Sequence, residues 1–159
     1  MPFSPEQKFL PFEKLAPLLQ KVERPGRYTG GEFGIPARDP GKARSRILLS
    51  YPDTYELGMS NEGLKILYDT VMRHGDFFAD RAYLPWTDMG SQMQAAGIEL
   101  HSLGHFMLAR SFDVWGFNVA HELHFSNILY ALELAGLPLL RRERRGNEPL
   151  IIAGGTAVT

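Results

Sequence analysis

Residues 46–63 read RILLSYPDTYELGMSNEG, and this stretch decides the fold. It begins with the apolar run Ile47–Leu49 and continues through a turn that contains Pro, Asp and Gly. Beyond the turn, apolar residues recur at i, i+3, i+4 and i+7 from Leu64 to Val71, which is typical of an amphipathic helix. The stretch therefore predicts a strand, a loop and a helix, an arrangement that can surround a ligand.

The same succession of strand and helix recurs along the rest of the chain. We expect strands at 81–86, 97–103, 113–119 and within 149–159, and helices at 87–96 and 121–135, which end at Gly97 and Gly136. Strands that alternate with helices imply right-handed crossovers and a parallel sheet. The predicted fold class is α/β, a Rossmann-like (flavodoxin-like) doubly wound parallel sheet.

The chain divides into a leader and a domain. Residues 1–44 combine a short helix around 12–22 with a segment rich in Pro and Gly, which predicts an irregular arm that packs on the domain or on a partner. Residues 45–159 form the α/β domain. Its last predicted strand ends in Gly154-Gly155, where such domains normally continue, so we expect the sheet to lack its last strand and helix.

Composition excludes several classes of function. With 17 Lys and Arg against 18 Asp and Glu, the chain has no broad basic field for DNA or an anionic membrane. It contains no cysteine, which excludes disulfides and any cysteine-ligated cluster held by this chain alone. Because no long apolar segment or signal peptide is present, we expect a cytoplasmic protein without a membrane partner.

The loop after the first strand contains Asp53, Tyr55 and Gly58 as D-x-Y-x-x-G. Ligands of parallel sheets lie beyond the carboxyl ends of the strands, where this loop is expected. An Asp there can cap a helix or orient a neighbour, and a Gly allows close approach of a planar ligand. An ordinary turn from strand to helix is the alternative.

This loop resembles the D-x-H-x-x-G loop of cobalamin-binding domains, in which the His replaces the lower base on cobalt and the Asp orients that His. Tyr55 occupies the His position, and a phenol with a pKa near 10 is a poor cobalt ligand. The resemblance thus implies cobalamin as a cofactor bound without a His lower ligand.

Five blocks taken together resemble a wider family. They are RYTGGE, YPDTYELGMSNEGLKILYD, YLPWTDM, FDVWGFNVAHELHFSNIL and LIIAGG. In order and spacing they are similar to the N-terminal region of bacterial radical S-adenosylmethionine (SAM) proteins, which have a cobalamin-binding-like domain before the radical domain. The resemblance implies a fold of the cobalamin-binding-domain type. The 4Fe–4S cluster and S-adenosylmethionine would belong to a radical SAM domain in cis or in trans, because its C-x-x-x-C-x-x-C loop is absent here.

The resemblance also implies which residues line the ligand face. The candidate cofactor-binding residues are Asp53, Tyr55, Gly58, Ser60, Asn61, Asn118, Glu122, Gly154 and Gly155. We assign no residue to catalysis or to a metal. Arg27 to Gly31 is the expected docking element for the radical domain.

The histidines leave one alternative open. His101 and His105 are four residues apart and His121 and His124 three apart, spacings that metal ligands can have, although HELH is not the H-E-x-x-H motif. We interpret them as ordinary polar loop residues, unless all four meet at the strand ends. The sequence thus favours an accessory domain of a radical SAM protein, with a free-standing ligand-binding or corrinoid-binding module as the alternative and a His-ligated metal hydrolase as the third hypothesis.

Overall fold

A computed structural model of the chain describes residues 8–32, 35–36 and 38–158. Its strands are β1 (Ser45–Ser50), β2 (Phe77–Ala82), β3 (Val114–Asn118) and β4 (Leu150–Gly154). Its α-helices are α1 (Phe12–Leu19), α2 (Tyr55–Met59), α3 (Glu62–Arg73), α4 (Thr87–Ala96) and α5 (His124–Leu134). Single 3-10 turns lie at Pro25–Arg27, Pro40–Lys42, Ala109–Ser111 and Arg141–Glu143. Among the described residues, no helix is long and apolar enough to cross a lipid bilayer.

The strands form a four-stranded, fully parallel sheet in the order β2-β1-β3-β4. This confirms the predicted α/β class with a doubly wound, Rossmann-like sheet. The chain crosses from β1 to β2 on one side of β1 and later returns to β3 on its other side, so β1 and β3 meet at the topological switch point. Sheets of this order bind ligands beyond the carboxyl ends of the strands at that point.

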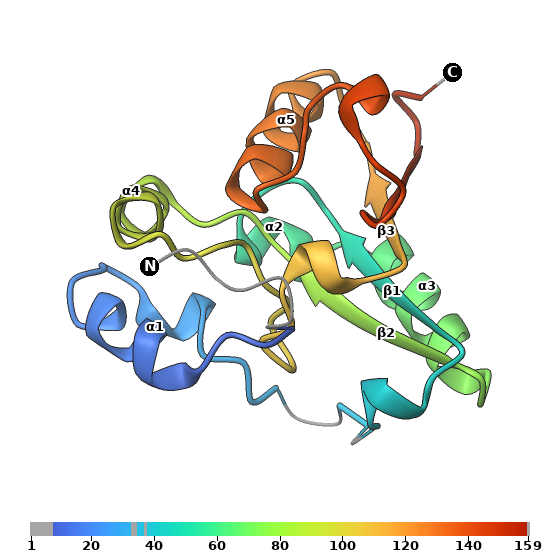
Figure 1. The fold of residues 1–159 in the computed structure, drawn as a ribbon, viewed down its shortest axis with the longest axis horizontal. Coiled ribbons are helices and arrows are strands. Elements are labelled where there is room, and N and C mark those ends of the chain that lie inside the picture. Colours follow the sequence, from blue (N-terminus) through green and yellow to red (C-terminus); the bar gives the residue numbers. More distant parts are fainter. Residues whose placement is uncertain (1–7, 33–34, 37, 159) are drawn as a thin grey trace.

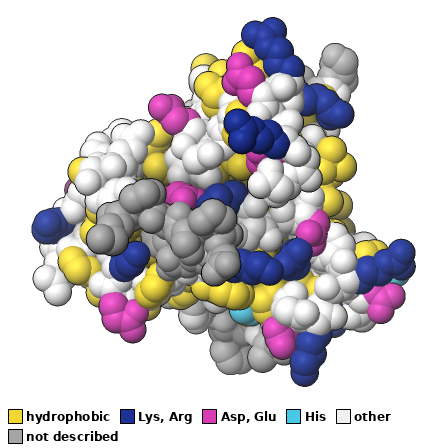
Figure 2. Space-filling model, viewed as in Figure 1, with side chains coloured by type: hydrophobic (Ala, Val, Ile, Leu, Met, Phe, Trp, Pro, Cys, Tyr) yellow, Lys and Arg dark blue, Asp and Glu magenta, His cyan; other side chains and the backbone are white. Residues whose placement is uncertain are grey.

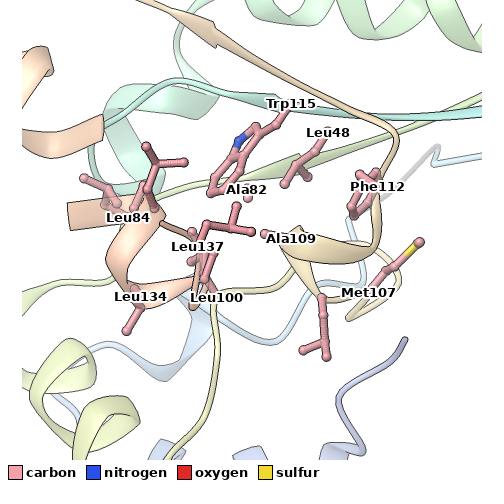
Figure 3. Packing of buried hydrophobic residues seen from close by; sticks show 14 of the residues in the cluster. Leu48, Ala82, Leu84, Leu100, Met107, Ala109, Phe112, Trp115, Leu134 and Leu137 are labelled. Atoms are coloured by element: carbon pink, nitrogen blue, oxygen red, sulfur yellow. The ribbon is translucent and has the colours of Figure 1, made fainter. Parts of the chain in front are cut away.

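Helices cover both faces of the sheet (Figure 1). On one face, Leu64, Tyr68 and Met72 of α3 pack against Leu49 and Ala79 of the sheet. On the other face lies the main core, which joins side chains from α1, α4, α5 and the loop before β3 to the sheet. Its centre is the fully buried Trp115, which lies near Leu48 in Figure 3 and pairs with it in register.

The N-terminal segment is part of this core. Leu15 of α1 is completely buried, and Leu10 and Leu18 belong to the same cluster as the sheet residues. α1 lies beside α4, as Figure 1 shows. Folding of the α/β domain and packing of residues 10–18 are therefore coupled through one hydrophobic core.

Two predicted strands were misplaced. The strand expected at 81–86 corresponds to β2, which begins earlier, at Phe77. The expected position was wrong because the buried Asp80 and Arg81 interrupt the apolar pattern of the strand. The segment 97–103 is not part of the sheet in the described residues. It buries Leu100 and Leu103 and forms an isolated bridge between His101 and Leu108. Its backbone N–H groups donate to the end of α5, to the loop that follows and to Arg81 of β2.

Charges of both signs are dispersed over the face shown in Figure 2, in agreement with a formal net charge of −1. The RRERR run at 141–145 is exposed apart from the half-buried Arg144, which donates to the backbone oxygen of Pro138.

Candidate functional site

The candidate site lies where β1 and β3 end, at the switch point of the sheet. The loop after β1 starts at Tyr51, and the loop after β3 runs from Val119 to Leu123. Two hydrogen bonds fix the first loop: the backbone oxygen of Pro52 accepts from Asn127 of α5 at 2.8 Å, and that of Asp53 accepts from the Leu84 N–H at 2.9 Å. The loop after β1 is therefore held by α5 and by the segment that follows β2.

Asp53 lies on the inner side of this loop. Its Oδ1 accepts a hydrogen bond from the Thr54 N–H at 2.7 Å, one residue before α2 begins. Its Oδ2 lies 4.0 Å from Nε2 of His124. Asp53 therefore orients the start of α2 with one oxygen and faces an imidazole with the other.

Tyr55 and Gly58 face a different neighbour, the ring of Tyr83. The Tyr55 and Tyr83 rings meet edge to face with centroids 5.7 Å apart. A Cβ placed on Gly58 would lie 2.2 Å from two carbons of the Tyr83 ring. Gly58 thus permits α2 to pack against Tyr83, and burial raises the pKa of Tyr55 above its ordinary value.

The arm covers this side of α2. Glu56 accepts hydrogen bonds from Arg27 at 2.8 Å and Arg24 at 3.1 Å, and the Tyr28 hydroxyl accepts from the Trp86 N–H at 3.0 Å. The guanidinium of Arg27 also lies 5.5 Å from the centroid of the half-exposed Trp86 ring. The segment expected to dock on a radical domain therefore has contacts with its own domain.

Asn61 and Asn118 connect the two loops. Asn61 Oδ1 caps α3 by accepting from the Leu64 N–H at 2.8 Å, and it also accepts from Asn118 Nδ2 at 3.0 Å. The Ser60 hydroxyl donates to the backbone oxygen of Leu57 at 2.8 Å and so belongs to the end of α2. Asn118 is the last residue of β3, so this pair joins the ends of both central strands.

The two glycines at the end of β4 have different surroundings. A Cβ on Gly154 would meet no atom within 4 Å, whereas one on Gly155 would lie 2.4 Å from the backbone oxygen of Val119. Gly155 also has φ of +124°, a conformation that favours glycine. Gly155 therefore serves close packing against the loop after β3, while Gly154 is open. Glu122 is exposed in that same loop.

Only one pair of histidines lies at the strand ends. The rings of His121 and His124 have centroids 3.8 Å apart, beside Asp53. His105 instead donates from Nδ1 to the carboxylate of buried Asp80 at 3.0 Å, and His101 packs near Phe106. The condition that all four histidines meet is therefore not fulfilled.

A buried charged cluster on β2 was missed in the sequence. Asp80 accepts from the backbone N–H groups of Arg81, Gly104 and His105. Arg81 forms an ion pair with Glu32 of the arm and lies 4.7 Å from the Tyr68 ring centroid. The only signal was the pair Asp80-Arg81 within an otherwise apolar stretch. The cluster fixes the arm and the loop 103–105 to the sheet.

Searches among curated proteins and among solved structures give no match. A family model described as "Radical SAM proteins, N-terminal" matches residues 63–159. The match begins after the D-x-Y-x-x-G loop and the arm, and it includes β2, β3, β4, the loop that contains His121 and the start of α5 with His124. Since it covers more than half of the 159 residues, the chain belongs to the family of N-terminal regions of radical SAM proteins.

Proposed function

We propose that this chain is an accessory domain that docks through the open side of β4 against further polypeptide of a radical SAM protein. The chain has no cysteine, so the thiolates that hold a 4Fe–4S cluster must come from another domain or chain. Reductive cleavage of S-adenosylmethionine would take place there, and this domain would position or cover that active site.

The exposed apolar surface of β4 is the observation that supports docking. Ile151 of β4 packs against the main core, whereas Leu150 and Ile152 are 54% and 49% exposed. A Cβ on Gly116 of β3 would lie within 3.6 Å of both Leu49 and Ile152, so these two side chains are on the same face of the sheet. Leu49 packs against α3, which covers this face farther along the sheet.

Both the edge and this face of β4 are therefore open. Among the described residues β4 pairs with β3 alone. Such an edge pairs readily with another strand and favours aggregation when it is left open. A strand and a helix of the radical SAM protein would complete the sheet and bury Leu150 and Ile152. A free-standing binding module would be expected to bury these side chains itself, so the surface supports the accessory domain over that alternative.

The test is the effect of Ile152→Lys on assembly with the radical SAM polypeptide. A charge at this position should weaken co-purification of this chain with the cluster-containing polypeptide, because the ammonium group would be buried on docking. Lys65→Ala, on the exposed surface of α3, is the matched control. Equal recovery of the complex with Ile152→Lys and with the control would contradict docking through β4.

We further propose that the strand ends at the switch point bind a flat ligand of the cobalamin type, with no protein His as its lower ligand. The open backbone of Gly154 and the position of Asn118 support this proposal. Because the Tyr55 ring faces Tyr83, Tyr55→Phe should leave the corrin absorption spectrum of the titrated protein unchanged. A large spectral change would contradict this mode of binding.

A further inference from the structure

Three side chains, from the loop after β1, the loop after β3 and the start of α5, converge beside the switch point. They are Asp53 after β1 and His121 and His124 after β3, and each offers one ligand atom such that all three atoms lie within 4.8 Å of one another. A tetrahedral zinc site with bonds of about 2.1 Å separates its ligand atoms by roughly 3.4 Å. Small side-chain movements would therefore bring these atoms to ligand distances around one ion.

His124 has a buried nitrogen that lacks a partner. Its side chain is completely buried, and Nε2 has no hydrogen-bond partner among the described residues. The nearest acceptor, Oδ2 of Asp53, is 4.0 Å away, beyond hydrogen-bond distance. A buried polar atom without a partner is unfavourable and usually indicates a missing water, ion or ligand. This atom faces the carboxylate of Asp53.

The ring of His124 is held in place by its neighbours. Its Nδ1 accepts a hydrogen bond from the Ala120 N–H at 3.2 Å. An ion at Nε2 requires the proton on Nδ1, so on metal binding Nδ1 would give up this acceptor role and become a donor, as in other metal-bound histidines. Tyr51 packs edge-on against the ring at 4.7 Å and limits its rotation.

The orientation of the other two ligands also suits a cation. Asp53 uses Oδ1 for the Thr54 N–H, so Oδ2 is left to face the histidines. His121 is exposed and can turn its ring toward the ion from the solvent side.

We propose that Asp53, His121 and His124 bind a divalent transition-metal ion, with a fourth position open to solvent. Two imidazoles and one carboxylate favour Zn²⁺, Co²⁺ or Ni²⁺ over Mg²⁺ and Ca²⁺, which prefer oxygen ligands. The open position could hold water or a small anionic ligand. The site does not depend on the proposed docking function, since all three ligands belong to this chain.

Titration of the full chain, purified without a histidine tag, with Co²⁺ and Zn²⁺ tests the proposal. Co²⁺ should give visible absorption bands of a tetrahedral site and saturate at one ion per chain, and Zn²⁺ should displace it. His121→Ala and Asp53→Asn should each weaken binding by more than the roughly 10–100-fold that follows loss of an outer-shell partner. His74→Ala, which removes an exposed histidine at the end of α3, is the matched control and should bind as the wild type does.

Thermal unfolding separates loss of the site from loss of the fold. Saturating Zn²⁺ should raise the melting temperature of the wild type and of His74→Ala, because a ligand that binds the native state stabilises it. It should leave that of folded His121→Ala unchanged. Absence of Co²⁺ bands at millimolar Co²⁺, or binding by His121→Ala and Asp53→Asn as tight as that of the wild type, would overturn the proposal. In that case a bridging water is the partner of His124 Nε2.

Discussion

Gly58→Ala tests whether Gly58 serves packing or a ligand. In an exposed helix interior, alanine is more stable than glycine by about 1 kcal/mol. Here the new methyl group would lie 2.2 Å from two carbons of the Tyr83 ring. That ring is held by the edge of Tyr55 and by its hydroxyl, which donates to the Met59 sulfur at 3.1 Å, so it cannot move away without losing these contacts.

The expected magnitude follows from two opposing effects. Overpacking costs up to about 3 kcal/mol, and the helix preference returns about 1 kcal/mol, which leaves a loss of about 2 kcal/mol in the free energy of unfolding. For a chain of this size the melting temperature should fall by about 4–8 °C. The assay is thermal or urea unfolding monitored by circular dichroism.

A double-mutant cycle identifies the cause of this loss. In a Tyr83→Ala background the clash is absent, so adding Gly58→Ala should be neutral or stabilising by up to about 1 kcal/mol. Equal stability of Gly58→Ala and the wild type would refute the packing argument. It would leave close approach of a ligand as the reason for glycine at this position.

Three further results are expected. Gly155→Ala should lower the free energy of unfolding by at least about 1–3 kcal/mol, because Gly155 has φ of +124° and a new Cβ would lie 2.4 Å from a backbone oxygen. Gly154→Ala should change the free energy of unfolding little. Equal effects of the two substitutions in urea unfolding would contradict the packing role of Gly155. Asn61→Ala should lower the free energy of unfolding by about 1 kcal/mol or more through loss of the α3 cap, and no change would exclude that cap as a stabilising contact. Arg46 lowers the pKa of Asp113, so their interaction stabilises the fold above the ordinary Asp pKa of 3.8 and is lost as the pH falls through the lower native pKa. The stability difference between the wild type and Asp113→Asn should therefore shrink in acid, and a difference independent of pH would exclude this linkage.

Periodicity predicted the elements whose apolar pattern is regular. The helix from Leu64 to Val71 lies within α3, α4 ends at the left-handed Gly97, and the strand expected at 113–119 is β3. In each case the apolar spacing or the terminating glycine reflects the burial that the structure shows. These elements suffice to predict the α/β class and the parallel sheet.

Elements were misplaced where tertiary contacts replace the local pattern. β2 contains Asp80 and Arg81, which contact the loop 103–105 and Glu32, respectively. Those partners are distant in the sequence, so the stretch does not read as a strand. The short helix α2 lies inside the predicted loop because its only strong local feature, Gly58, disfavours a helix and is explained by Tyr83.

The cofactor-binding role of the candidate residues stays a prediction, and the structure brings only some of them together. Asp53, Asn61, Asn118 and Gly154 lie at the ends of the central strands or beside them, as the topology requires. Tyr55 and Gly58 face the arm side instead, because α2 turns them toward Tyr83. The approach of Asp53 to the two histidines joins segments about 70 residues apart, which no spacing in the sequence indicates.

The most direct test of the accessory-domain account is the intact mass of the native gene product from its own cells, with peptide mapping of every polypeptide that co-purifies with it. The account predicts that C-x-x-x-C-x-x-C occurs either in the same polypeptide beyond Thr159 or in a stoichiometric partner that binds a 4Fe–4S cluster. A product that ends at Thr159, is monomeric and has no such partner would contradict it.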